Sequence, residues 1–585
     1  MSDPIDRTVY LARGGKPHVA NIAHLTDTRN CVSTAHHLYQ GLVRGEKDPD
    51  FALICAALRD QRDTDPDSPT FGCLKWYRED PAIGDTNASF FICLPLSLAW
   101  LNHRDQLTDE EAEALRAIFA AVAPWFRHMA DSPSLFYPNK CLGDVAMLLV
   151  TGYILGDDAI QQEARDFCRR FLDYVERRGM GWGEDHSPVY TRVIAEMGLL
   201  IMLLEQRGEL YDRTRAMIDG LMEWAAFHDG LDAVPSIRGY NFKCDLEVPW
   251  GLLELVDGAE PKDANAPLAV LARATGYSYT PAVQPVPRSR RQRTFDDHWS
   301  VSHIREHARL GTLSHYPIMA NATSHDGWGL AWQSKPASLI VPGQDYGVLE
   351  WATVDDEGTP RQHEAAGTIW DYASRHLFKR VSFHPEVIMA AHQHEGAAII
   401  FREVHHLHSP TVRLEDRWRL AHGGGRVLLG GHEWDGAPTS APADWLVLVY
   451  PDCAVALHPL QCRVLDAPED DPNPQRREQG NIVTLPPRLE RTDRGLQVSL
   501  PLIAEDRGVI TQPLLFSGWC VVLLDDPAQV AGLSVQESFR EDGELPRTYG
   551  ELIRTVELTS PYGAVKLERD MLSGGERRWT DGTPA

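Results

Sequence analysis

Three short polar segments, each leading into an expected helix, carry the side chains best suited to chemistry. They cover residues 84–87, 137–140 and 182–190, and their candidates are Asn87, Asn139, Lys140, Trp182, Glu184 and Tyr190. The first turn of a helix presents unpaired N–H groups and the positive end of the helix dipole, so helix starts that lie together form a natural anion site. Asn and Asp before a helix are usually caps, and capping is the alternative at these positions. The aromatic bulk around the second and third segments is more than a cap requires.

The elements that would bring these segments together are helices, which are expected from about residue 20 to residue 275. Apolar residues recur there at three- and four-residue spacing, and the best-marked helices cover residues 107–129, 157–178, 188–207 and 210–228. Thr108 and Glu111 form a capping box, and Gly179 follows a helix end. Helical hairpins that close on themselves make an α/α toroid, whose inner helices run parallel and start at one rim. A linear solenoid is the alternative, but no fixed-length repeat is visible.

The chain after residue 295 has a different character. Short runs rich in Val, Ile, Leu and Trp alternate with Gly, Pro, Asp and Asn, which favours a large antiparallel β-sandwich. The proline- and arginine-rich residues 281–295 are interpreted as a linker, and the tail from about residue 572 is expected to fray. The predicted fold class is multidomain α + β. An incomplete α/α toroid over residues 1–280 precedes the linker, and an antiparallel β-sandwich covers residues 296–585.

The composition is that of an ordinary globular protein with an acidic surface. The 585 residues carry a formal net charge of −26, which disfavours nucleic acid and anionic lipid as partners and confines an anionic substrate to a locally basic cleft. The start of the chain lacks a secretory signal pattern. The longest apolar stretches, such as residues 197–204, fall far short of the roughly 20 residues that a membrane helix needs. With ten scattered cysteines and no CxxC pair, we expect reduced thiols and a cytoplasmic location.

The order of the polar segments resembles that of a known family. Asn139 lies in YPNK, Tyr190 in SPVYTRV and His325 in ANATSHDGWGLAW. With the helical half and the strand-rich half, these residues resemble the heparinase II/III-like and alginate-lyase group of polysaccharide lyases. Members often carry H-x-H followed by Asp in the last segment, whereas this chain has Thr323 at the first of those histidine positions.

The resemblance implies a carbon–oxygen lyase that cleaves a glycan containing uronic acid by β-elimination and leaves an unsaturated uronate. Asn139 would stabilise the negative charge that develops at the uronate carboxylate, aided by Lys140. Tyr190 would act as acid, or as both acid and base when both protons are on one face, and His325 would be the base for the other epimer. A tyrosine base needs a pKa below its usual value of about 10, which the nearby Arg192 could favour.

Further side chains in the helical half could bind the substrate. Trp182 could stack on a sugar face, Glu184 could orient a base or bind hydroxyl groups, and Asn87 lies at the proposed rim. Arg192 and Arg238 could bind carboxylates, and Tyr240 and Asn241 follow in a polar loop at the same rim. The alternatives are ordinary: tryptophans in the core and arginines in solvated ion pairs.

No cofactor is required by this reaction, and no catalytic metal is expected. Relatives sometimes hold a metal in the β domain, so a structural divalent ion, Zn or Ca, is open there. Its candidate ligands are His325, Asp345 and His363, and His392 and His394 share one side of an expected strand. Hydrogen-bonded histidines on a sheet surface are the alternative. The expected partner is an acidic oligosaccharide or polysaccharide, and a homo-oligomer is also open.

Two other classes of function fit the same segments. An α/α-toroid glycoside hydrolase would use a carboxylate pair, for which Asp85, Glu184 and Asp185 are available at the rim. A non-catalytic carbohydrate-binding protein would keep the aromatic lining and tolerate the loss of the Tyr190 hydroxyl. A lyase leaves an unsaturated sugar that absorbs ultraviolet light, whereas a hydrolase leaves none.

Overall fold

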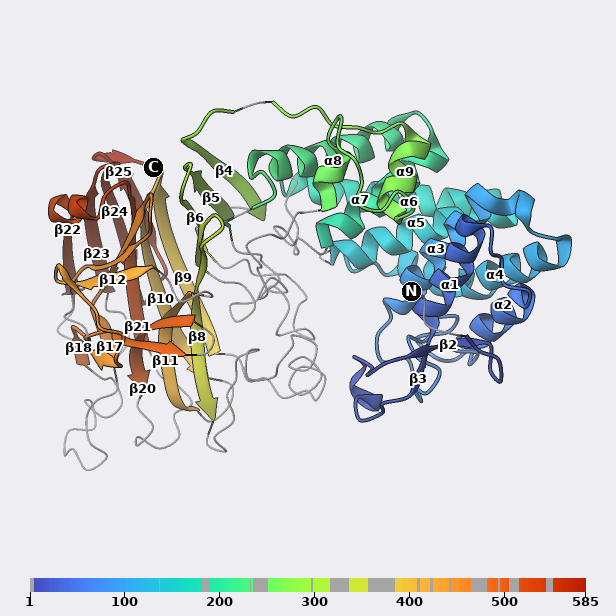
Figure 1. Cartoon of the computed structure of the whole chain (residues 1–585), viewed down its shortest axis with the longest axis horizontal. Coiled ribbons are helices and arrows are strands. Elements are labelled where there is room, and N and C mark those ends of the chain that lie inside the picture. The colour runs from blue at the N-terminus through green and yellow to red at the C-terminus, as the bar shows by residue number, and fades with distance from the viewer. Residues whose placement is uncertain are drawn as a thin grey trace.

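The structure is a computed structural model of the chain. It describes residues 5–135, 137–179, 190–231, 233–234, 251–282, 284–295, 298–315, 336–355, 385–407, 411–420, 425–440, 444–464, 481–492, 495–503, 515–542 and 551–585. Figure 1 shows the helices at one end of the molecule and the large sheets at the other. The predicted fold class, a helical region followed by antiparallel sheets, is confirmed.

The helical region begins with a small antiparallel sheet and continues as paired helices. The strands are β1 (Ile5–Asp6), β2 (Leu11–Gly14) and β3 (Thr28–Asn30), and the short 3-10 helices are η1 (Ala20–Ile22), η2 (Arg104–Gln106) and η4 (Gly251–Leu255). The helices are α1 (Cys31–Arg44), α2 (Phe51–Arg59), α3 (Ala88–His103), α4 (Asp109–Asp131), α5 (Pro138–Leu155), α6 (Asp158–Arg177), α7 (Tyr190–Glu205), α8 (Glu209–Phe227) and α9 (Pro267–Thr275).

These helices form an inner and an outer layer. α3, α5 and α7 are buried on nearly every face, and α5 packs against α3, α4, α6 and α7. α4, α6 and α8 bury one face and expose the other. Such alternation of inner and outer helices is the pattern of the predicted α/α toroid.

Local signals fixed the helix ends closely. Thr108 Oγ1 accepts a hydrogen bond from the Glu111 N–H at 3.2 Å, and Glu111 Oε2 accepts one from the Thr108 N–H at 2.8 Å, so the predicted capping box opens α4. Asp157 Oδ1 caps α6 by accepting from the N–H groups of Ala159 and Ile160 at 2.9 and 3.1 Å. The four best-marked helices begin and end within two residues of their predicted bounds.

The strand-rich region contains three antiparallel sheets among the described residues. The first has the order β14 (Thr439–Ser440), β19 (Arg488–Thr492), β20 (Gly495–Ile503), β11 (Thr411–Leu420), β8 (Asp345–Asp355), β7 (Ala337–Val341), β6 (Arg309–Leu313), β5 (His298–Ile304), β4 (Arg288–Phe295). The middle sheet has the order β13 (His432–Glu433), β12 (Arg426–Leu429), β15 (Leu446–Val449), β16 (Ala454–Pro459), β21 (Leu515–Leu524), β10 (Ala397–Leu407), β9 (Pro385–His394), with β17 (Cys462–Val464) and β18 (Asn481–Val483) beside it. The third has the order β22 (Ser534–Asp542), β23 (Glu551–Ser560), β24 (Gly563–Asp570), β25 (Glu576–Thr580), β26 (Thr583–Pro584), and η8 (Pro527–Gly532) precedes it.

The middle sheet has an apolar core on each face. One core joins it to the first sheet and contains the buried Trp418 and Trp519, and the other joins it to the third sheet. Every residue of β21 is therefore buried, as expected for a strand covered on both sides. The first two sheets form the predicted sandwich, and the third sheet adds a layer that the sequence interpretation lacked.

The prediction of a frayed tail is wrong. β25 and β26 complete the third sheet, and Glu576 of β25 is held by Arg569 and Arg578, the latter at 2.6 Å. Arg569 in turn pairs with the fully buried Glu403 of β10. Polar tail residues that read as solvated in the sequence are thus ordered by ion pairs to neighbouring strands.

The predicted linker 281–295 is in part a strand, because β4 occupies Arg288–Phe295 at the edge of the first sheet. Arg288 Nη2 donates to the Phe227 carbonyl at 2.7 Å, and Arg290 pairs with Glu223 of α8 at 3.3 Å. Arginines on an edge strand face outward, and here they meet the end of a helix. Arg288 and Arg290 therefore mark an interface between the two regions.

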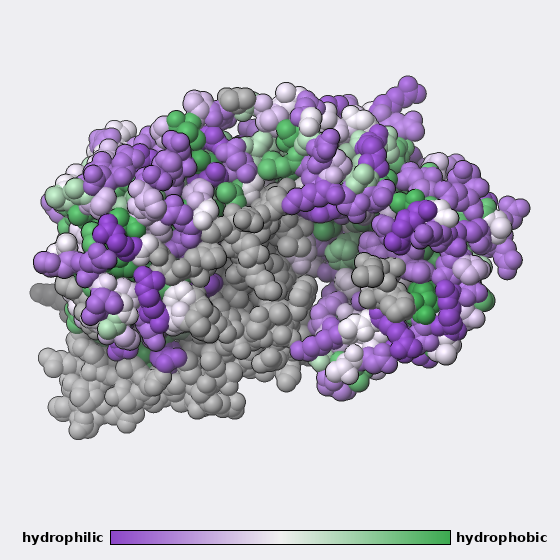
Figure 2. All heavy atoms as spheres, viewed as in Figure 1, coloured by the Kyte–Doolittle hydropathy of each residue, from purple (hydrophilic) through white to green (hydrophobic). Residues whose placement is uncertain are grey.

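The surface agrees with the acidic, polar composition. On the face drawn in Figure 2, hydrophilic residues cover most of the described surface and apolar residues are scattered among them. Among the helices in the described ranges, none combines the length and the apolar character needed to cross a bilayer.

Candidate active site

The first two polar segments meet directly. Asn87 Nδ2 donates a hydrogen bond to Tyr137 Oη at 2.7 Å, which joins the start of α3 to the start of α5. Asn87 makes no side-chain cap bond to α3, and its buried Oδ1 accepts no hydrogen bond from any residue that the structure describes. The capping alternative therefore fails for Asn87. Its Nδ2 connects the starts of two helices, and its Oδ1 can still accept a hydrogen bond.

Asn139 and Lys140 lie in the first turn of α5. Pro138 occupies the first turn as predicted for a helix start, and the N-cap Tyr137 makes no side-chain cap bond. Asn139 is fully buried inside the helix and is not a cap either. The residue before α3 and the residue before α5 therefore make no side-chain cap bond to their helices. The first-turn N–H groups are not taken by these caps, and an anion site at helix starts needs such N–H groups.

Lys140 has a buried counter-ion. Its Nζ lies 2.8 Å from Asp144 Oδ2 and 5.0 Å from the centre of the Trp125 ring. Burial raises the pKa of Asp144 to about 6, against the opposing effect of Lys140. The ammonium charge is therefore largely neutralised above pH 6, and less so below it.

Tyr190 is the first described residue of α7 and is 6% exposed. Arg192, two residues later, donates from Nε to Glu196 Oε1 at 3.1 Å. Burial raises the pKa of Glu196, and Arg192 opposes this shift. The ion pair with Glu196 therefore neutralises part of the Arg192 charge within α7. The Arg192 side chain is 37% exposed.

Asn139 and Tyr190 lie at the same end of the helical region. Gln161 Nε2 of α6 donates to the Gly152 carbonyl of α5 at 3.4 Å, and Arg165 Nε of α6 donates to Glu205 Oε1 of α7 at 2.9 Å. The C-terminal parts of α5 and α7 therefore both flank the first half of α6. Because α5 also packs against α7, the two helices run in the same direction and their starts lie together.

The other predicted site residues lie outside the described residues. They are His325, Trp182, Glu184, Arg238, Tyr240 and Asn241, together with Asp185 of the hydrolase alternative and His363 of the metal alternative. The described part of the site thus consists of Asn87, Asn139, Lys140, Tyr190 and Arg192. The catalytic and binding roles of both groups stay predictions.

Sequence reasoning missed a histidine near the start of α3. His18 Nδ1 lies 3.2 Å from Tyr77 Oη, and its ring packs edge-on against Trp76 at 4.7 Å. Burial lowers the pKa of His18, while the charges of Asp85 and Asp80 oppose that shift. Asp85 belongs to the first polar segment and accepts a hydrogen bond from the Asn87 N–H at 2.9 Å. A lone histidine in a loop gives no sequence signal, so only the fold could place it here.

The expected metal ligands in the β region are not brought together in the part of the chain that the structure describes. Asp345 is buried and accepts a hydrogen bond from Tyr450 Oη at 2.9 Å. His392 Nε2 lies 3.1 Å from the Trp579 carbonyl. The described residues contain no group of three or more His, Cys, Asp or Glu side chains that could hold a metal ion. The structural divalent metal stays a prediction.

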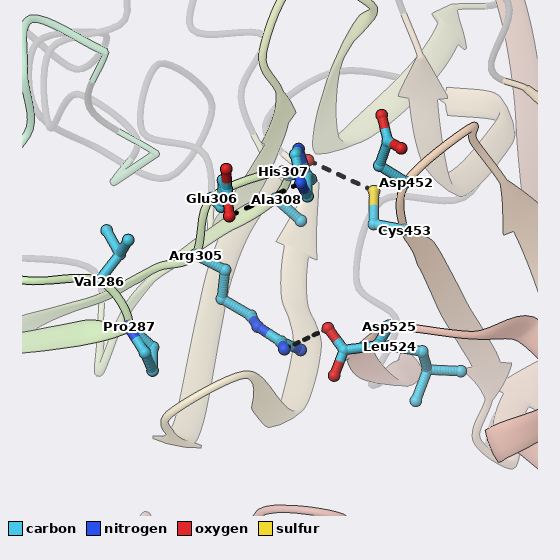
Figure 3. Close-up of a pocket in the computed structure, with 10 residues that line it drawn as sticks. All are labelled: Val286, Pro287, Arg305, Glu306, His307, Ala308, Asp452, Cys453, Leu524 and Asp525. Carbon is cyan, nitrogen blue, oxygen red and sulfur yellow. Dashed lines mark hydrogen bonds and ion pairs between the residues drawn. The ribbon is translucent and has the colours of Figure 1, made fainter.

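A small cavity of about 170 Å³ lies beside the turn between β5 and β6 (Figure 3). Its Arg305 pairs with Asp525, and Cys453 Sγ donates to the His307 carbonyl at 3.3 Å. Burial raises the pKa of Cys453 to about 11. The cavity therefore offers neither an unpaired guanidinium nor a reactive thiolate.

The chain is similar to known proteins in its fold and not in its sequence. No family model matches the chain, and neither does any curated protein sequence. The fold is similar to the crystal structure of heparinase III, with a TM-score of 0.47 and 10% identity over 92% of this chain and 82% of that one. Two structures of a heparinase III gene product, one with methylated lysines, give TM-scores of 0.38 and 0.36, again at 10% identity, and cover 92% of this chain and 83% of theirs. These similarities concern the course of the chain and do not assign a reaction.

Proposed function

We propose that this chain is a polysaccharide or oligosaccharide lyase that cleaves a glycan containing uronic acid by β-elimination. The proposal is supported by the positions of an amide and a phenol: Asn139 and Tyr190 lie in the first turns of α5 and α7, two inner helices that run in the same direction and pack against each other. These are the groups and the setting that elimination next to a carboxylate needs.

The chemistry divides between the two side chains. Removal of the C5 proton places negative charge on the neighbouring carboxylate, and Asn139 and the first-turn N–H groups of α5 would stabilise that charge. The electron pair of the broken C–H bond forms the C4–C5 double bond while the C4–O bond breaks. Tyr190 would protonate the leaving oxygen, and would also take the C5 proton when both lie on one face. His325 is our proposed base for the other epimer.

Asn87 would contribute in a different way. Its Nδ2 is held by Tyr137, which leaves the buried Oδ1 as an acceptor for a sugar hydroxyl. Asn139 and Tyr190 are 0% and 6% exposed, so the proposal requires covering side chains to move when a glycan binds.

The direct test is a panel of oligosaccharides that contain glucuronate, iduronate, mannuronate, guluronate or galacturonate. We expect at least one to give a rise in ultraviolet absorbance from the unsaturated product. Cleavage with no such rise would support the hydrolase alternative instead. Binding of a uronate oligosaccharide without cleavage would support a non-catalytic carbohydrate-binding protein.

The uronate, the linkage and the mode of attack are left to that panel. The cytoplasmic location, the structural divalent metal and the homo-oligomer stay predictions from the sequence, as does the absence of a required cofactor.

A further inference from the structure

A second cavity, of about 640 Å³, lies in the strand-rich region, where the edge of the first sheet meets the middle and third sheets. Its walls come from β4, β5, β6, β9 and the C-terminal strands. Its size lies within the roughly 300–1,000 Å³ of small-molecule sites. It shares no lining residue with the helix starts that form the candidate active site.

The cavity concentrates positive charge in an acidic protein. Arg290, Arg291 and Arg578 line it, with Glu395 as the acidic side chain among the described lining residues. Arg290 is paired with Glu223 outside the cavity. Among the described residues Arg291 has no ion-pair partner, and its guanidinium lies over the Trp299 ring, 4.5 Å from the centroid. This is the locally basic setting that an anionic ligand needs on a chain of net charge −26.

Arg578 is held rigidly beside this pair. Its Nη2 lies 2.6 Å from Glu576 Oε2, and Nε donates to the Ala391 carbonyl at 3.2 Å. Glu576 also accepts from His315 Nε2 at 2.7 Å and pairs with Arg569, so one carboxylate serves three partners. Burial lowers the pKa of Arg578, and the charge of Arg291 adds to that effect. The guanidinium groups of Arg291 and Arg578 therefore repel one another in this cavity. A bound oxyanion would offset that repulsion.

The rest of the lining suits a sugar better than a bare anion. Trp299 supplies an aromatic surface, and Thr312 Oγ1 donates to Gln393 Oε1 at 2.8 Å in the wall. His392 Nε2 donates to the Trp579 carbonyl, which leaves Nδ1 as an acceptor, and burial lowers the pKa of His392 to about 4. At neutral pH this histidine therefore contributes hydrogen bonding and no charge.

We propose that this cavity binds one anionic sugar unit, with its carboxylate or sulfate at Arg291 and Arg578 and its ring against Trp299. The recognition of an oxyanion follows from the arginines, whereas the choice of a sugar rests on the proposed function. The site would hold a unit of an acidic glycan away from the reacting bond.

The test is calorimetric titration of the full chain with glucuronate, glucose 6-sulfate and glucose. We expect at least one of the two charged sugars to bind and glucose to bind at least tenfold more weakly, and the stronger of the two identifies the anion. Arg291→Gln should weaken that binding at least tenfold. Arg426→Gln, which removes an exposed β12 arginine paired with Glu433, is the matched control and should leave binding unchanged.

Two results would overturn the proposal: no binding of either charged sugar, or an Arg291→Gln affinity within twofold of the unmodified chain. Asn139→Ala locates the ligand independently, since it should leave this binding intact. Loss of binding in Asn139→Ala with retention in Arg291→Gln would place the anion at the helix starts and reject the cavity. Arg291-dependent binding without an ultraviolet product on any oligosaccharide would reject the proposed lyase activity and leave the cavity site standing.

Discussion

At the level of single residues, the amide side chains of Asn87 and Asn139 lie at helix starts but do not act as helix caps. Asn87 precedes a helix, as a cap would, yet it bonds to the phenol of Tyr137 from another helix. Asn139 lies within the first turn and is fully buried. A buried amide costs free energy unless it is hydrogen-bonded, and the bond to Tyr137 meets this need for Asn87 Nδ2.

Tyr190→Phe should abolish turnover and leave glycan binding nearly unchanged, because the substitution removes only the hydroxyl that transfers a proton. A loss of at least 100-fold in kcat is expected from the usual contribution of general acid–base catalysis. The measurement is the initial rate of ultraviolet increase on the best oligosaccharide of the panel.

Tyr153→Phe is the matched control for that experiment, since Tyr153 lies on α5 and is 53% exposed. It should keep full activity. Near-normal turnover in Tyr190→Phe would remove Tyr190 from the mechanism.

Asp144 should make stability depend on pH in an unusual direction. Burial raises its pKa from 3.8 to about 6, so the folded state binds a proton more tightly than the unfolded state. The contribution of Asp144 is therefore fully present below pH 4 and is lost as pH rises through 6, by roughly 3 kcal/mol at most. We expect the free energy of unfolding of the unmodified chain, relative to Asp144→Asn, to fall between pH 4 and pH 7.

Urea denaturation at a series of pH values measures this difference. Lys140 also loses its ion-pair partner in Asp144→Asn, so the pH dependence of the difference is the quantity compared, and its absolute size is not. Glu113→Gln, an exposed carboxylate on α4, is the control and should give a flat difference. A flat difference for Asp144→Asn as well would mean that its pKa is not raised.

At the scale of elements, the position of the site depends on how closely α3 and α5 approach. Gly143 of α5 faces the Phe90 ring of α3, and a Cβ at this position would lie 2.8 Å from Phe90 Cγ. Phe90 is fully buried and cannot swing away. The glycine therefore sets the separation of the two helices within two turns of the Asn87–Tyr137 bond.

Gly143→Ala should lower the free energy of unfolding by about 1–3 kcal/mol through overpacking, and should also reduce turnover by shifting α3. Gly220→Ala is the matched control in α8, where a Cβ meets no atom within 4 Å. It should stabilise the chain by up to about 1 kcal/mol, the ordinary gain of Ala over Gly inside a helix. Equal effects of the two substitutions in thermal denaturation would contradict this account of the contact.

At the scale of the whole molecule, the end of α8 anchors the helical region on the first sheet. His228 Nδ1 donates to the Trp224 carbonyl at 2.9 Å, and Nε2 forms a hydrogen bond with Ser302 Oγ at 2.9 Å. Arg309 of β6 donates to the Leu231 carbonyl at 2.9 Å. These bonds hold β5 and β6 against the end of α8, and β4 pairs with β5 beside them.

Gly311→Ala should weaken this anchor, because a Cβ there would lie 2.3 Å from the Ala233 carbonyl oxygen. We expect scanning calorimetry of Gly311→Ala to show separate unfolding transitions for the helical and strand-rich regions. In the unmodified chain the two transitions should lie closer together in temperature. Gly532→Ala, where a Cβ meets nothing within 4 Å, is the control and should leave the transitions unchanged. Unaltered transitions in Gly311→Ala would show that the contact does not couple the two regions.

Local caps and the period of apolar residues suffice to predict the two halves, the ends of the best-marked helices and several of the strands. Thr108 and Glu111 suffice to start α4, and the apolar run at 337–341 is a strand with those same bounds. Long-range packing makes residues 288–295 and the tail into strands, bonds Asn87 to Tyr137, and brings Arg291 and Arg578 to one cavity. Each of these joins residues 50 to nearly 300 positions apart, or depends on ion pairs with distant strands, and no local spacing encodes such a contact.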